Sequence, residues 1–153
     1  MKTHTITFRL NGETCTLDVE ANELLLDVLR DKVGVKSPKA GCERGDCGSC
    51  TILLEGKSVR SCLILAVEVD EQEITTVEGL SRDGLSPLQQ AFLNHSSFQC
   101  GFCAPGMVLS VTELLGKNPH PAKEEIQEAI AGNLCRCTGY QPIIDAVLEL
   151  TKK

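Results

Sequence analysis

The chain has 153 residues and a formal net charge of −6, which allows one compact domain or two very small ones and excludes nucleic-acid binding, because that function needs clustered lysine and arginine. The longest apolar run, Leu63 to Val67, is far shorter than the roughly 20 residues that cross a bilayer, so no membrane contact is expected. The N-terminus has no apolar core of a secretory signal, which predicts a cytoplasmic location.

The N-terminal segment predicts a β-hairpin. Apolar and polar residues alternate over residues 6–10 and again over residues 15–19, and Asn11-Gly12 tolerates the positive φ angles of a two-residue turn. Cys15 shares the apolar face of the second strand and is predicted to be a small buried residue rather than a ligand. Asn22 is then expected to cap a helix with an apolar stripe, which Gly34 ends.

Residues 37–50 have no periodicity, and their proline and glycines predict an irregular loop that wraps around a bound group. A second hairpin is expected over residues 51–61, with its turn at Glu55-Gly56, and residues 74–77 predict one more short strand. The polar, glycine-containing segment that follows predicts a domain boundary, with a first domain of residues 1–78 and a second of residues 79–153.

The second part has a helical pattern. Ser86 and Gln89 form a capping box around Pro87, which marks the start of a helix. Prolines open each of the other expected helices, where a missing N–H costs nothing. Four short helices indicate a small bundle, the last three being expected over residues 105–115, 121–131 and 142–150.

Nine cysteines are the unusual feature of the composition. Their odd number and the missing export signal argue against a disulfide scaffold and favour metal ligation. Four of them have the spacing C-x4-C-x2-C-x11-C of a plant-type 2Fe-2S ferredoxin, which zinc fits poorly. Glycines in the same loop allow backbone N–H groups to point at the sulfurs. The predicted ligands are Cys42, Cys47, Cys50 and Cys62.

A second set of four cysteines has the spacing C-x2-C-x31-C-x-C. Both pairs lie at expected helix ends, where free backbone N–H groups can donate to sulfur. The spacing alone is compatible with a cluster and with tetrahedral zinc. The set consists of Cys100, Cys103, Cys135 and Cys137.

Three stretches around these cysteines, GCERGDCGSCT at 41–51, QCGFCAPGM at 99–107 and GNLCRCTGY at 132–140, resemble the iron-sulfur small subunits of the xanthine oxidase family of molybdenum hydroxylases. The resemblance covers nearly the whole chain, with Ala104 where threonine is more usual. It implies an α+β protein, in which a β-grasp ferredoxin domain precedes a four-helix bundle. It also implies one 2Fe-2S cluster in each domain, including the second cysteine set.

The resemblance further implies an electron-transfer subunit with no catalytic residue of its own. Electrons would pass from a molybdenum-pterin cofactor on a large partner subunit through both clusters to FAD on a medium subunit, in a dimer of heterotrimers. By the same resemblance, Gln99 hydrogen-bonds the pterin and Cys137 lies against it. No large extension is present, which predicts a separate small subunit.

Two alternatives belong to other function classes: a free-standing ferredoxin-type electron shuttle and a zinc-stabilised interaction module. The first would need only the N-terminal cysteine set. The three histidines have no spacing relation to the cysteines, so Rieske-type ligation is unsupported. For Arg136, between two predicted ligands, contact with a cluster, contact with a partner and simple solvation all remain open.

Overall fold

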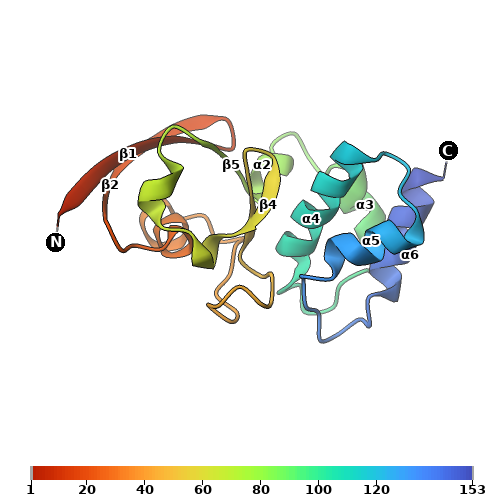
Figure 1. Cartoon of the computed structure of the whole chain (residues 1–153). Coiled ribbons are helices and arrows are strands. Elements are labelled where there is room, and N and C mark those ends of the chain that lie inside the picture. Colours follow the sequence, from red (N-terminus) through yellow and green to blue (C-terminus); the bar gives the residue numbers. More distant parts are fainter. Residues whose placement is uncertain (1, 153) are drawn as a thin grey trace.

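The computed structural model describes residues 2–152, in which a β-sheet half and a helical half lie side by side (Figure 1). The described chain starts at the outer end of the sheet and finishes at the outer end of the helices. The loop of residues 37–50 lies where the two halves meet (Figure 1). No helix among the described residues is long and apolar enough to span a membrane.

The N-terminal half is built on a mixed five-stranded sheet with the strand order β2-β1-β5-β3-β4. Strands β1 and β5 pair in parallel, and the other neighbours are antiparallel. Both predicted hairpin turns are confirmed, with positive φ angles at Asn11-Gly12 and Glu55-Gly56. The strands are β1 Thr3–Leu10, β2 Glu13–Glu20, β3 Thr51–Leu54, β4 Lys57–Arg60 and β5 Glu73–Thr75.

One face of this sheet is covered by a helix that begins as α1, Leu25–Asp27, and continues as a π-helix, η1, Val28–Val33. Leu25, Val28 and Leu29 are buried against the sheet, which is the β-grasp arrangement. Gly34 ends the helix in the left-handed conformation, as predicted. Two 3₁₀ turns complete this half, η2 Ser61–Leu63 and η3 Ala66–Val69.

The prediction that Asn22 caps this helix is wrong. The helix starts after Leu24, whose backbone is extended and whose side chain makes no capping hydrogen bond. Leu24 forms an isolated antiparallel bridge with Leu65, and this bridge holds it outside the helix. The carboxylate of Glu23 is engaged before the helix, because it accepts the Glu20 N–H at 2.6 Å.

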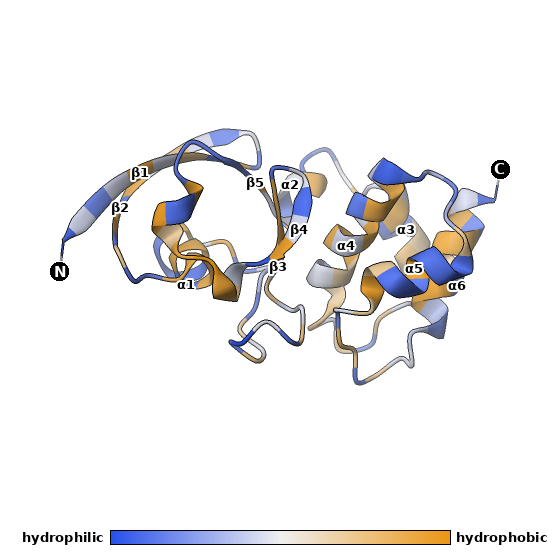
Figure 2. Ribbon diagram, viewed as in Figure 1, coloured by the Kyte–Doolittle hydropathy of each residue, from blue (hydrophilic) through white to orange (hydrophobic). Residues whose placement is uncertain are grey.

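The C-terminal half contains the four expected helices in contact as a small bundle (Figure 2). The capping box is confirmed: the Gln89 N–H donates to Ser86 Oγ at 3.2 Å, and the Ser86 N–H donates to Gln89 Oε1 at 2.8 Å. Apolar residues concentrate between the helices (Figure 2). The helices are α3 Pro87–Asn94, α4 Ala104–Lys117, α5 Lys123–Ile130 and α6 Gln141–Thr151.

The prediction that a proline opens the helix is wrong for one of these helices. Helix α5 begins at Lys123, two residues after Pro121. The carboxylate of Glu125 accepts the N–H of Ala122 at 2.7 Å and so caps the helix at this later residue.

A further short helix, α2, Val77–Leu80, begins at the last residue of the strand predicted over residues 74–77 and continues into the segment that was expected to be irregular, whereas the strand itself ends at Thr75. Val77 and Leu80 pack against the helical core. Glu78, between them, accepts hydrogen bonds from the backbone and hydroxyl of Ser37 in the first half. The segment thus contacts both halves, and the division at residues 78 and 79 stays a prediction.

Candidate metal centres

The first cysteine set is gathered by the loop of residues 37–50 and by the turn η2. Cys50, at the end of the loop, and Cys62, in η2, are buried together with Leu26. Cys42 lies nearer the surface, and its Sγ accepts the N–H groups of Asp46 and Cys47, each at 3.3 Å. This loop therefore surrounds sulfur with backbone donors, as a buried anionic group requires.

Burial and hydrogen bonding move the pKa values within this set in opposite directions. The backbone N–H of Arg44, followed by that of Cys47, lowers the pKa of Cys42 from 9.0 to about 7. Burial, followed by the neighbouring Cys50, raises the pKa of Cys62 to about 11. A metal that binds both thiolates must therefore displace a proton from Cys62 at neutral pH.

Glycine is required at several places in this loop, and Gly41 and Gly45 are two of them. A Cβ on Gly41 would lie 2.8 Å from Cys47 Sγ. Gly45 has a φ of +88°, and a Cβ there would lie 2.5 Å from a methyl carbon of Leu63. The close wrapping of the loop around its thiols thus depends on these glycines.

The second set surrounds a cavity of about 230 Å³. Cys103 is buried directly before α4, while Cys135 and Cys137 come from the loop between α5 and α6. Cys137 Sγ lies 3.6 Å from Cys100 Sγ, and both of these residues are exposed. Cys47 of the first set lines the same cavity, so the two cysteine sets are direct neighbours.

The pKa values in the second set are also split. The N–H of Phe102 lowers the pKa of Cys100, whereas burial, followed by Cys135, raises that of Cys103 to about 12. Burial raises the pKa of Cys135, but the Thr138 hydroxyl and backbone N–H groups outweigh it, so its pKa is lowered overall. Each set therefore combines an accessible, acidic thiol with a buried, weakly acidic one.

Backbone groups join the two cysteine loops. The Leu134 N–H, beside Cys135, donates to the carbonyl of Cys47 at 2.8 Å. This hydrogen bond links Cys47, a predicted ligand of the first set, to the neighbour of Cys135, a predicted ligand of the second set.

Asn133 holds the loops together from the inside, and sequence reasoning missed it. It is 1% exposed; its Nδ2 donates to the Gly48 carbonyl at 3.2 Å, and its Oδ1 accepts from Ser110 Oγ at 2.8 Å. Arg60 adds a second contact by donating to the Gly132 carbonyl at 2.7 Å. We call these contacts the domain interface, formed by residues 47–51 and Arg60 on one side and by residues 106–110 and 132–134 on the other.

The two residues expected to meet a pterin lie together at the surface. Gln99 Nε2 donates to the carbonyl of Cys137 at 3.1 Å, and both residues are exposed. Arg136 is also exposed and lines the cavity of the second set. The structure thus brings Gln99 and Cys137 to one outer face, where a group from another subunit could reach them.

The donor sets fit 2Fe-2S clusters. Each offers four thiols and no nitrogen or oxygen ligand, which suits iron-sulfur chemistry. Among residues 2–152, no three His, Cys, Asp or Glu side chains converge on a point that would hold a single metal ion.

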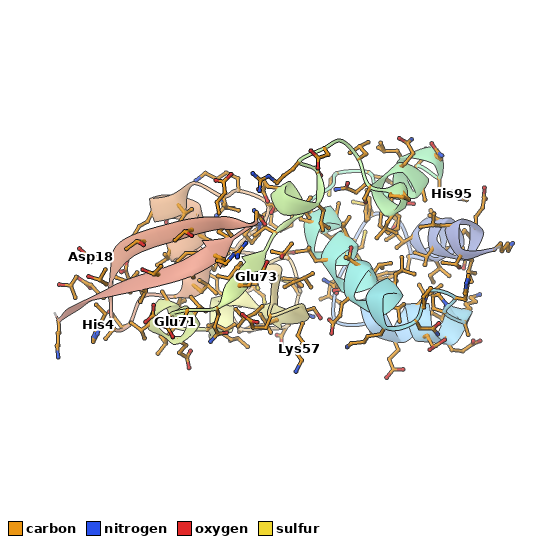
Figure 3. The ribbon with its side chains drawn as sticks, turned by 90° about the horizontal axis from the view of Figure 1, so that it is seen from above. His4, Asp18, Lys57, Glu71, Glu73 and His95 are labelled. Carbon is orange, nitrogen blue, oxygen red and sulfur yellow. The ribbon has the colours of Figure 1, made fainter. Side chains whose placement is uncertain are left out.

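Residues outside the two sets are engaged elsewhere. Cys15 packs against the sheet core, and burial raises its pKa. His4 and His95 lie at opposite ends of the molecule (Figure 3), and His95 pairs with Glu149 at 2.9 Å. His120 contacts the carbonyl of Thr151 through its Nδ1.

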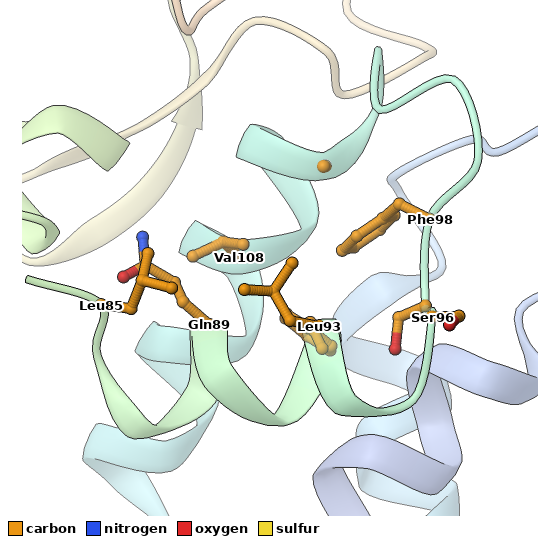
Figure 4. A pocket seen from close by; sticks show the side chains of 9 residues that line it. Leu85, Gln89, Leu93, Ser96, Phe98 and Val108 are labelled. Atoms are coloured by element: carbon orange, nitrogen blue, oxygen red, sulfur yellow. The ribbon is translucent and has the colours of Figure 1, made fainter.

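An apolar pocket of about 390 Å³ lies beside the segment that leads to Gln99 (Figure 4). Helices α3 and α4 form its walls, with Phe98 and Val108 among the lining residues. Leu85 and Leu93 at the pocket are 53% and 61% exposed. No thiol lines it, so it is separate from both cysteine sets.

Comparison with known proteins gives consistent matches over both halves. The family model for the 2Fe-2S iron-sulfur cluster binding domain matches residues 8–81. A second family model, for a 2Fe-2S binding domain, matches residues 76–148. The chain therefore contains two 2Fe-2S binding domains, one in each half.

Individual proteins match over almost the entire chain. The nicotine 6-hydroxylase small subunit of Paenarthrobacter nicotinovorans is 54% identical over 144 residues, which cover 94% of this chain and 87% of that protein. The nicotinate dehydrogenase small FeS subunit of Eubacterium barkeri is 50% identical, covering 94% of this chain and 92% of that protein. A chain in the crystal structure of quinoline 2-oxidoreductase from Pseudomonas putida 86 superposes with a TM-score of 0.95 at 45% identity, covering 99% of this chain and 94% of that one.

Proposed function

We propose that this chain, which belongs to the iron-sulfur small subunits of the xanthine oxidase family of molybdenum hydroxylases, conducts single electrons between two partner subunits of an oxidoreductase complex. The donor is a molybdenum-pterin site on a large subunit, and the acceptor is FAD on a medium subunit. Each 2Fe-2S cluster, when bound, accepts and releases one electron. The chain itself supplies no catalytic residue.

Each of the two cysteine sets would hold one of the two clusters. The ferredoxin-like half would hold its cluster through Cys42, Cys47, Cys50 and Cys62, and the helical half through Cys100, Cys103, Cys135 and Cys137. In both sets, backbone N–H groups point at the accessible thiol and lower its pKa. The same donors stabilise the added negative charge of a reduced cluster.

The contact between the two sets is the observation that supports this proposal most strongly. Cys47 lines the cavity of the second set, and its carbonyl accepts the N–H of Leu134. A free-standing ferredoxin shuttle would need only the first set, with its exposed edge left open to solvent. Here the second set lies directly behind the first, which favours conduction in series within a fixed complex.

Gln99 and Cys137 are proposed to form the entry point for electrons. Both are exposed and hydrogen-bonded to each other on the outer side of the helical half. The Gln99 amide retains an oxygen acceptor and a second N–H for a pterin, and Cys137 offers a ligand sulfur at the same surface. These two groups would orient the cofactor of the large subunit beside the second set.

The proposed assembly is a cytoplasmic dimer of heterotrimers with one large, one medium and one small subunit in each half. The test is to purify the tagged chain from its native host and to measure subunit masses, iron, molybdenum and flavin. Co-purification of both partners, with two rhombic 2Fe-2S signals in reduced-state EPR, supports the proposal. A chain that arrives alone with its iron intact would favour the shuttle, and a colourless, EPR-silent chain would favour zinc.

The substrate is selected by the large subunit and not by this chain. The relatives reported above are named for nicotine, nicotinate and quinoline, which are nitrogen heterocycles. Turnover of the purified complex should therefore be tested first on that class.

A further inference from the structure

Lys39 reaches from the ferredoxin-like half to the helical half. Its backbone is fixed in the cysteine loop, where its N–H donates to the Ser49 carbonyl at 2.9 Å. Its Nζ lies 5.4 Å from the centre of the Phe102 ring and 3.4 Å from the Phe102 carbonyl, to which it donates. Phe102 lies between Cys100 and Cys103, so the ammonium is placed against the loop that carries half of the second cysteine set.

No carboxylate balances this charge at close range. Among residues 2–152, Lys39 takes part in no ion pair, and the hydrogen-bond acceptors of its Nζ are the carbonyls of Ser37 and Phe102. The charge of Glu78 acts on Lys39 without forming an ion pair, and the Glu78 carboxylate accepts hydrogen bonds from Ser37 and Thr76. A half-buried ammonium without a carboxylate partner needs another source of negative charge.

The second cysteine set is one such source. Burial lowers the pKa of Lys39, and the positive charge of Arg30 lowers it further, whereas the negative charge of Glu78, followed by the charges of Cys103 and Cys100, raises it. The ammonium contacts both the carbonyl and the ring of Phe102, the residue directly before Cys103. The cation therefore lies against the helical half, although its backbone is fixed in the ferredoxin-like half.

We propose that Lys39 raises the reduction potential of the helical-domain cluster relative to that of the ferredoxin-domain cluster. This inference rests on the proposed function, in which each set holds a 2Fe-2S cluster. Such a cluster carries about two negative charges when oxidised and about three when reduced. A fixed cation beside it stabilises the reduced form more, and partial burial limits the screening of this attraction.

The test is an EPR-monitored redox titration of the intact complex with Lys39→Met, which keeps the aliphatic stem and removes the charge. The helical-domain signal is identified as the one that survives Cys42→Ser. We expect its potential to fall relative to the other, with about a tenfold change in the electron distribution between the clusters, or about 59 mV for one electron. Lys39→Arg should remain close to wild type.

Lys36→Gln is the matched control, because it removes the same charge three residues earlier, directly before the cysteine loop. Lys36 is exposed, and its Nζ donates to the Arg30 carbonyl at 2.6 Å, away from both cysteine sets. This variant should leave both potentials unchanged.

Three results would overturn the role of Lys39: no shift in Lys39→Met with both signals present, an equal shift of both clusters, or loss of the helical-domain signal together with its iron. The last would mean that the side chain retains the cluster rather than tuning it. Absence of two 2Fe-2S signals in the wild-type complex would instead contradict the proposed function itself.

Discussion

The side chain of Cys47 lines the cavity of the second cysteine set, although its place in the sequence assigns it to the first. Cys42 is its useful counterpart, since it belongs to the same set but does not line that cavity. The two residues therefore separate loss of the first cluster from disturbance of the second.

We expect Cys42→Ser to remove the ferredoxin-domain EPR signal and to leave the helical-domain signal with unchanged g values, without the coupling to the lost cluster. Cys47→Ser should remove the same signal and also shift the g values of the other one, because the substituted side chain lies against the second cavity. The measurement is low-temperature EPR of both reduced variants. Identical helical-domain spectra in the two variants would show that the Cys47 side chain does not influence the second set.

Glu113 provides a pH-dependent contact between the halves. Its carboxylate accepts the Ser58 N–H at 2.8 Å and pairs with Lys117. Burial raises its pKa, but Lys117 and Ser58 outweigh burial, so the pKa lies below the model-compound value of 4.5. The unfolded chain thus binds this proton more readily than the folded chain does.

The stabilisation by Glu113 is therefore complete above pH 4.5 and is lost as the pH falls through the lower pKa of the folded state. Glu113→Gln should cost about 1 kcal/mol of unfolding free energy at pH 7, and the difference from wild type should shrink on acidification. Chemical denaturation at a series of pH values measures this difference. A difference in unfolding free energy that stays constant down to pH 3.5 would contradict a stabilising role of the ionised Glu113 carboxylate.

At the scale of elements, helix α4 approaches the cysteine loop through Gly106. A Cβ at this position would lie 2.4 Å from the Gly48 carbonyl, whereas a Cβ on Gly116, near the other end of the same helix, meets nothing within 4 Å. The helix therefore contains two glycines, of which only the first is required by packing.

Gly106→Ala should lower the unfolding free energy by about 1–3 kcal/mol, because backbone at the domain interface must move to admit the methyl group. Gly116→Ala should raise it by up to about 1 kcal/mol, since alanine is the better helix former. Thermal unfolding of both variants gives the comparison. Equal effects of the two substitutions would mean that the domain interface admits the methyl group at position 106 without a loss of unfolding free energy.

Local sequence signals predicted those elements whose cause is local. The turns at residues 11–12 and 55–56 and the capping box at Ser86 depend on neighbouring residues alone, and they were confirmed. The start of α1 was predicted wrongly because Leu24 is held by Leu65, which is distant in the sequence. The π-helical turn of η1 had no sequence signal that we could identify.

At the scale of the whole molecule, the candidate site also combines features that depend on neighbouring residues with features that depend on distant ones. Cysteine spacing indicated both sets, yet the ligand assignments remain predictions, and nothing in the spacing indicated that the sets adjoin. Asn133 appeared as part of a helix end, and its role emerges only when α4, α5 and the cysteine loop are assembled around it. Contacts between distant segments of this kind leave no periodic pattern to detect.

Asn133→Ala tests this central contact. It removes the acceptor of the buried Ser110 hydroxyl and one of the donors to the Gly48 carbonyl, which keeps its hydrogen bonds from Thr51, and this should cost about 2 kcal/mol. The looser interface should also weaken the magnetic coupling between the two reduced clusters in low-temperature EPR. Asn94→Ala, at an exposed position in α3, is the control and should change neither quantity. Unaltered magnetic coupling in Asn133→Ala would mean that other contacts hold the domain interface rigid.

Several acceptors at the domain interface are main-chain carbonyls, namely those of Cys47, Gly48 and Gly132. Such groups are present whatever side chains the loops carry, so the docking of one half onto the other is largely insensitive to sequence divergence. Halves exchanged between two relatives should therefore fit each other, provided that the glycines at 48 and 106, the arginine at 60 and the asparagine at 133 are retained. Proline at 134 would be the exception, because it removes the N–H that joins the two loops. The two halves could therefore be recombined between relatives to give chimeric electron-transfer subunits.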